Sequence, residues 1–134
     1  MTFEEELSQL SAKCKNYIRI GRISMYSDAL KELADLFRRN ECIRDQMKIL
    51  IHSFYLDLSG FGRASFIDRD LIIQLDLAMK KSSIDINVLE SLFFNWVQPD
   101  LMPQHALGLK DCWYLLRLCI EGKLDQADYI LTRI

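Results

Sequence analysis

The sequence predicts an all-α fold: a compact single-domain bundle or orthogonal array of six to seven helices, with no sheet. Apolar residues recur at helical spacing along almost the whole chain, and no stretch alternates as a half-buried strand would. Only five Gly and two Pro interrupt the 134 residues. This length is that of one domain, residues 1–134, and 50% hydrophobic content is enough for a buried core.

The first helix is expected over residues 2–16. Thr2 and Glu5 form a capping box, which satisfies N–H groups that a helix start leaves without partners. The acidic run at residues 4–6 lies at the positive end of the helix dipole, so the helix itself explains this run. The apolar residues make one stripe, which predicts packing on one side only.

The next two helices are expected to lie nearer the centre. Ser27 should cap a second helix over residues 28–39, which has the cleanest amphipathic pattern in the chain. A third helix over residues 41–58 has apolar residues on two sides, which indicates a central position. His52 falls on the charged side of this helix, so a solvated surface imidazole is expected there.

The remaining helices follow a loop at residues 59–63. Ser65 and Asp68 form a second capping box, which predicts a helix from residue 65 to residue 81. Three further helices are expected over residues 85–97, 110–121 and 124–134. Both prolines of the chain fall in the loop between the first and the second of these three. Gly122 should end the penultimate helix in the left-handed conformation, so that the last two form a hairpin.

The charge and hydropathy exclude several classes of protein. The chain has 17 basic and 19 acidic residues and a pI near 5.7. It therefore lacks the basic surface that is typical of proteins that coat nucleic acids, and no nucleic-acid partner is expected. Long apolar runs such as residues 115–120 are interrupted by charge, so no membrane span is expected. The acidic start does not resemble a secretory signal, and a cytoplasmic location follows as the expectation.

Residues that could carry chemistry are few. The four cysteines form no C-x-x-C pair, which favours small buried side chains in a reducing compartment over disulfides or zinc ligands; they are Cys14, Cys42, Cys112 and Cys119. No hydrolase, metalloprotease, phosphate-loop or calcium-loop motif is present. We therefore expect no enzyme activity, no catalytic residue, no metal site and no cofactor.

The most informative pattern is a stretch without any Lys or Arg, residues 82–109. Within it, Phe94 falls beside Glu90 on the polar side of the helix over residues 85–97, where an aromatic is out of place. Either neighbouring segments cover Phe94, or it anchors a partner surface with an acidic rim. The candidate partner-binding residues are Glu90, Phe94, Asp100, Met102 and His105.

Three functional classes fit these observations. The preferred one is a non-catalytic protein-binding protein, most concretely a bacterial immunity or antitoxin-type inhibitor that neutralises a basic, nuclease-like toxin domain. The second is a helical adaptor or a homodimeric subunit, associating through the helices over residues 66–81 and 110–121. The third is an enzyme or ligand binder with a pocket near residues 98–114. Four side chains would converge there: Asp100, His105, Trp113 and Tyr114.

Overall fold

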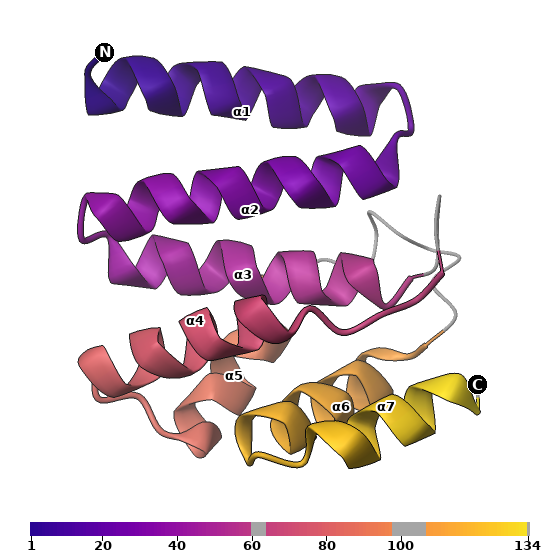
Figure 1. Ribbon diagram of the computed structural model, residues 1–134. Helices are drawn as coiled ribbons and strands as arrows, with labels where there is room; N and C mark the ends of the chain where they lie inside the picture. Colours follow the sequence, from indigo (N-terminus) through magenta and orange to yellow (C-terminus); the bar gives the residue numbers. More distant parts are fainter. Residues whose placement is uncertain (60–63, 98–106, 134) are drawn as a thin grey trace.

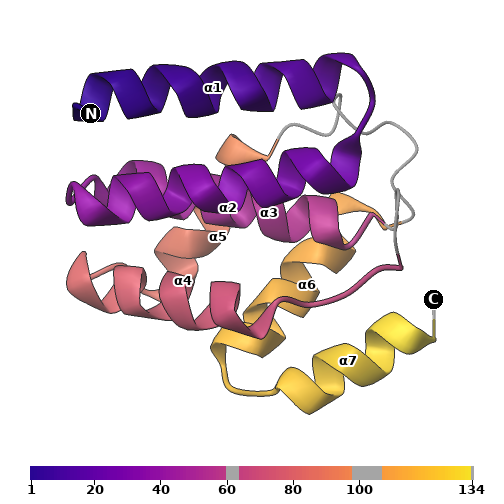
Figure 2. The same cartoon turned by 45° about the horizontal axis from the view of Figure 1, so that its top comes forward.

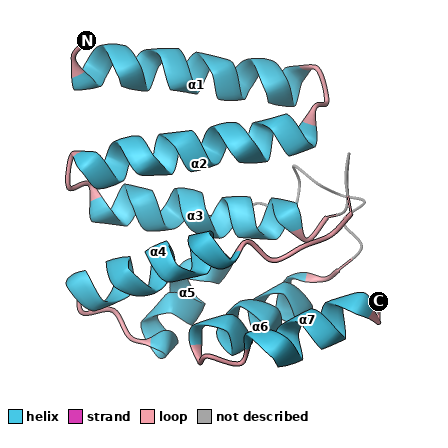
Figure 3. Ribbon diagram, viewed as in Figure 1, coloured by secondary structure: helices cyan, strands magenta, loops and turns pink. Residues whose placement is uncertain are grey.

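Seven helices make up most of the computed structural model, which describes residues 1–59, 64–97 and 107–133. The helices are α1 (Phe3–Arg19), α2 (Ile23–Arg39), α3 (Ile43–Asp57), α4 (Arg69–Lys81), α5 (Ile86–Trp96), α6 (Leu109–Ile120) and α7 (Leu124–Thr132). No strand occurs in the described parts of the chain (Figure 3). The predicted all-α fold is confirmed.

The first four helices lie in a row, and each runs antiparallel to the one before it (Figure 1). α5 lies behind α4, and α6 and α7 form a hairpin at the end of the molecule farthest from α1 (Figures 1 and 2). α3 occupies the middle of this arrangement, and its two apolar sides pack against α2 on one side and against α4 and α5 on the other. The predicted central position of this helix is therefore confirmed.

The core joins both halves of the arrangement. Aromatic and aliphatic side chains from α3, α5 and α6 are almost completely buried, among them Phe54, Tyr55, Phe93 and Leu115. Burying such side chains contributes roughly 1.5–3 kcal/mol each. The part of α5 that carries Phe93 is thus anchored firmly to the rest of the protein.

Four helix–helix turns share one geometry. In each, a residue with positive φ follows the helix, and the next N–H bonds back to a carbonyl five residues earlier, as in a Schellman motif. The positive-φ residues are Gly21, Glu41, Ser83 and Gly122. The bonds run from Arg22 to Tyr17, Cys42 to Phe37, Ile84 to Met79 and Lys123 to Leu118, at 2.8–2.9 Å. The predicted left-handed conformation of Gly122 is confirmed.

Two predicted helix starts are wrong. α2 begins at Ile23, before Ser27, and Ser27 is a buried residue inside this helix instead of its cap. α4 begins at Arg69, because the Asp68 carboxylate accepts bonds from the N–H groups of the first turn. Ser65 does not cap this helix; its hydroxyl donates to the Leu58 carbonyl at 3.0 Å. In both cases a polar side chain has a tertiary partner in place of a local one.

Candidate functional site

The candidate partner-binding surface lies on α5. The Asp85 side chain accepts a bond from the Val88 N–H at 2.9 Å and so fixes the start of this helix. Leu89 and Phe93 are fully buried on its inner side. Glu90 and Phe94 are exposed and stand one turn apart on its outer side. We call these two residues the Glu90–Phe94 surface.

Phe94 is supported from behind by two buried aromatic rings. Its ring centroid lies 5.2 Å from that of Phe93 and 6.5 Å from that of Trp113 on α6, and both pairs are tilted or edge-on. Phe93 and Trp113 contact each other at 5.6 Å. Phe94 nevertheless remains 41% exposed, whereas Trp113 is only 6% exposed. The cluster presents one aromatic ring to solvent on a rigid base.

The three other predicted partner-binding residues lie outside the described part of the chain. These are Asp100, Met102 and His105. The pocket expected near residues 98–114 has only two of its candidate residues in the described part. Trp113 and Tyr114 are adjacent in α6 but do not face the same way, because Trp113 is buried and Tyr114 is exposed.

Known proteins offer no guide to the role of this surface. No protein family, curated protein or solved structure matches the chain. Among the described residues, no helix is both long and apolar enough to cross a membrane. The same residues contain no group of three or more His, Cys, Asp or Glu side chains placed to hold a metal ion. The functional argument therefore depends on the chain's own geometry.

The predicted solvated position of His52 is wrong. This side chain is half-buried beside Tyr26, with 6.0 Å between the ring centroids, and its Nε2 atom is fully buried without a hydrogen-bond partner. Burial, together with the positive charge of Lys48, lowers the pKa of His52 from 6.5 to about 4. The imidazole is thus neutral at physiological pH. A helical wheel of α3 alone could not show this, because α2 supplies the covering ring.

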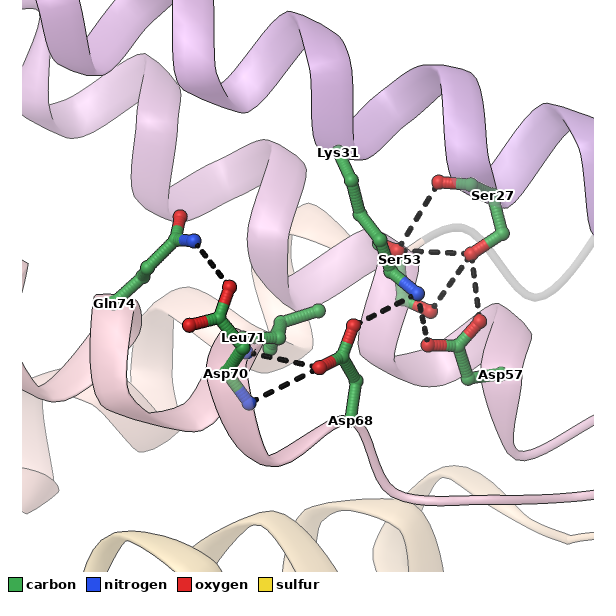
Figure 4. Close-up of polar contacts among 8 residues, drawn as sticks. All are labelled: Ser27, Lys31, Ser53, Asp57, Asp68, Asp70, Leu71 and Gln74. Atoms are coloured by element: carbon green, nitrogen blue, oxygen red, sulfur yellow. Dashed lines mark hydrogen bonds and ion pairs between the residues drawn. The ribbon is translucent and has the colours of Figure 1, made fainter.

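A polar cluster, buried at Ser27, Ser53 and Asp57, links α2, α3 and the start of α4 (Figure 4). The Ser27 hydroxyl donates to the Asp57 carboxylate at 2.7 Å, and the hydroxyls of Ser27 and Ser53 lie 2.8 Å apart. Lys31 Nζ lies 2.9 Å from Asp57 and 3.1 Å from Asp68, so one ammonium group bridges two carboxylates. The cluster ties three segments together across the core.

Sequence reasoning missed this cluster, although a signal was present. Ser27 and Lys31 are four residues apart on α2, and Ser53 and Asp57 are four residues apart on α3. Polar residues at this spacing beside an apolar stripe indicate a shared polar face between helices. Buried polar groups arranged in this way hold helices in one register, and the cluster needs no ligand to explain it.

Three of the four cysteines are buried, and Cys42, just before α3, is half-buried. Cys112 and Cys119 are buried on the inner side of α6, as the sequence predicted, and Cys14 is buried on α1. Burial raises the pKa of Cys112 and of Cys119 to about 12. These two thiols stay protonated at neutral pH and are poor nucleophiles.

Proposed function

We propose that this chain is a cytoplasmic protein-binding module without catalytic activity, and that its partner contacts the Glu90–Phe94 surface. The observation that carries the proposal is the exposed Phe94 ring on its buried aromatic base. Aromatic side chains that are held in one position lose little conformational freedom on binding, which makes them effective anchors. Asp100, Met102 and His105 are proposed to extend the same surface.

The concrete version is a bacterial immunity or antitoxin-type inhibitor of a basic, nuclease-like toxin domain. Its support is the charge around the aromatic anchor. Glu90 stands one turn from Phe94, and the sequence holds no Lys or Arg between residues 82 and 109. An acidic surface attracts a basic partner and raises the association rate. A nuclease domain is a suitable partner because its nucleic-acid-binding face is basic.

The test uses a toxin-like protein encoded beside the gene for this chain. The purified proteins should form a tight one-to-one complex, measured by light scattering and by stopped-flow association. Glu90→Lys should slow association at low salt, with a smaller effect at high salt. Phe94→Ala should mainly speed dissociation, with an affinity loss of about 30-fold or more if Phe94 is a binding hot spot.

Matched controls separate this surface from general effects of charge and aromatic content. Glu4→Lys changes the same charge on α1, and Tyr129→Ala removes an exposed aromatic from α7. Both controls should bind like the unchanged protein. Equal association rates for Glu90→Lys and Glu4→Lys would remove the acidic surface from the proposal. The absence of any complex with the neighbouring gene product would remove the inhibitor version.

A further inference from the structure

The outer face of α4 carries an apolar pair that no described element covers. The inner face of this helix packs on the core through five buried residues, namely Leu71, Ile72, Leu75, Ala78 and Met79. On the outer face, Ile73 is 58% exposed and Leu77 is 60% exposed. The two side chains stand one turn apart and form a continuous apolar strip. An exposed apolar residue is ordinary on a protein surface, so the pair acquires meaning only from its neighbours.

One charged residue lies beyond each end of this pair on the same side of the helix. Asp70 stands three residues before Ile73, and Lys80 stands three residues after Leu77, and both are exposed. The spacing of residues 70, 73, 77 and 80 follows the three–four–three pattern that keeps side chains on one seam of a helix. The seam therefore has a negative end, an apolar centre and a positive end. Its negative end also coincides with the helix N-terminus and its positive end with the C-terminus, as the helix dipole favours.

We propose that this seam binds the same seam of a second copy of the chain, with the two α4 helices antiparallel. A two-fold axis beside Leu75 places Ile73 of each copy opposite Leu77 of the other. The same axis places Asp70 of each copy opposite Lys80 of the other, so both ends of the seam gain an ion pair. A parallel arrangement would instead set Asp70 against Asp70 and Lys80 against Lys80. Charge complementarity thus selects the second copy and its direction.

The monomer's own contacts are compatible with this pairing. Asp70 accepts a bond from Gln74 at 2.9 Å, and Lys80 pairs with Asp76 at 2.9 Å. Both are exposed contacts within one helix, and exposed ion pairs contribute only about 0–1 kcal/mol. They therefore compete weakly with contacts across a dimer. Leu77 also lines a groove of about 240 Å³ between α2, α3 and α4, whose lining is mixed and includes the charged Arg38 and Lys81.

The size of the seam sets the expected strength of the dimer. α4 has 13 residues and is about 20 Å long. A contact centred on one such helix lies at the small end of specific interfaces, where association is weak and depends on concentration. We therefore expect mostly monomer at low micromolar protein and an increasing mass, up to twice 15.7 kDa, as the concentration approaches the millimolar range.

Sedimentation equilibrium of the purified chain tests the dimer directly. Leu77→Lys should abolish self-association, whereas Met25→Lys, which makes the same kind of change at an exposed apolar residue on α2, should leave it unchanged. Circular dichroism confirms that each variant is folded. A mass of 15.7 kDa at every concentration overturns the proposal, and so does equal self-association of the two variants.

A charge exchange tests the antiparallel direction. Asp70→Lys alone and Lys80→Asp alone should each weaken the dimer at least tenfold, because each sets like charges opposite one another. The double variant, with both substitutions in one chain, should recover the affinity of the unchanged protein. In a parallel dimer the double variant would still oppose like charges, so no recovery overturns the proposed direction. These measurements need no toxin partner, so their outcome is independent of the proposed inhibitor function.

Discussion

The imidazole of His52, whose Nε2 atom is buried, predicts a specific dependence of stability on pH. In the folded protein its pKa is lowered to about 4, whereas in the unfolded chain it returns to the ordinary value of 6.5. Between these two values the unfolded state binds a proton that the folded state does not. Protonation therefore favours unfolding, and the free energy of unfolding should fall as the pH drops through this window. Above pH 6.5 the imidazole is neutral in both states and has no such effect.

The magnitude follows from the two pKa values. At pH 4.5 the linkage relation gives a loss of about 2.5 kcal/mol relative to pH 7.5, with about 3 kcal/mol as the limit at lower pH. This is a large fraction of the 5–15 kcal/mol that is typical of the whole stability of a domain. A surface imidazole with an unshifted pKa would contribute nothing over the same range.

The assay compares urea unfolding of the natural chain with that of His52→Phe at several pH values. Phenylalanine keeps a ring beside Tyr26 and removes the titrating nitrogen, whose buried Nε2 has no hydrogen bond to lose. Carboxylates titrate in both proteins, so the difference between the two free energies isolates His52. That difference should change by about 2.5 kcal/mol between pH 7.5 and 4.5. A constant difference, or an NMR titration of His52 near pH 6.5, would refute the reasoning.

Three further predictions concern the free energy of unfolding and are measured by denaturant unfolding. Lys31→Met should destabilise the protein by about 3 kcal/mol, because it removes the ammonium group that bridges the buried Asp57 carboxylate to Asp68; a loss no greater than that for an exposed lysine would contradict the bridging role. Glu41→Gly should stabilise by about 0.5–1 kcal/mol, since it relieves a side chain held at positive φ, and no gain would mean that this turn is unstrained. Phe93→Ala should cost roughly 3–5 kcal/mol and Phe94→Ala much less, and similar losses would show that Phe94 belongs to the core.

The fold class was readable from the sequence because it depends on properties within each helix. Apolar spacing identified all seven helical segments, and the wheel of one helix was enough to set Phe94 beside Glu90 on the exposed side of α5. What the wheel could not supply is the support behind Phe94. Trp113 lies on another helix, and its position against Phe94 depends on how α5 and α6 pack.

The errors share one physical cause, which is that tertiary partners replaced local ones. Ser27 has the chemistry of a helix cap, but it lies inside α2, where its hydroxyl donates to the buried Asp57 carboxylate on α3. Asp68 takes the capping role that the sequence pattern gave to Ser65. The packing of α2 against α3 covers His52 in the same way. Each of these residues is polar and lies close to an apolar stripe, where its burial and its hydrogen-bond partner depend on the neighbouring helix.

The turns show the same division between local and tertiary control. Gly21 and Gly122 are residues that adopt positive φ without strain, and a glycine after a helix is readable from sequence. Glu41 and Ser83 take the same backbone conformation with a side chain present, at an energetic cost of about 1 kcal/mol each. The packing on either side of these turns must supply that energy. α2 and α3, which flank Glu41, make the most extensive helix contact in the described structure, and this explains why that turn is held without glycine.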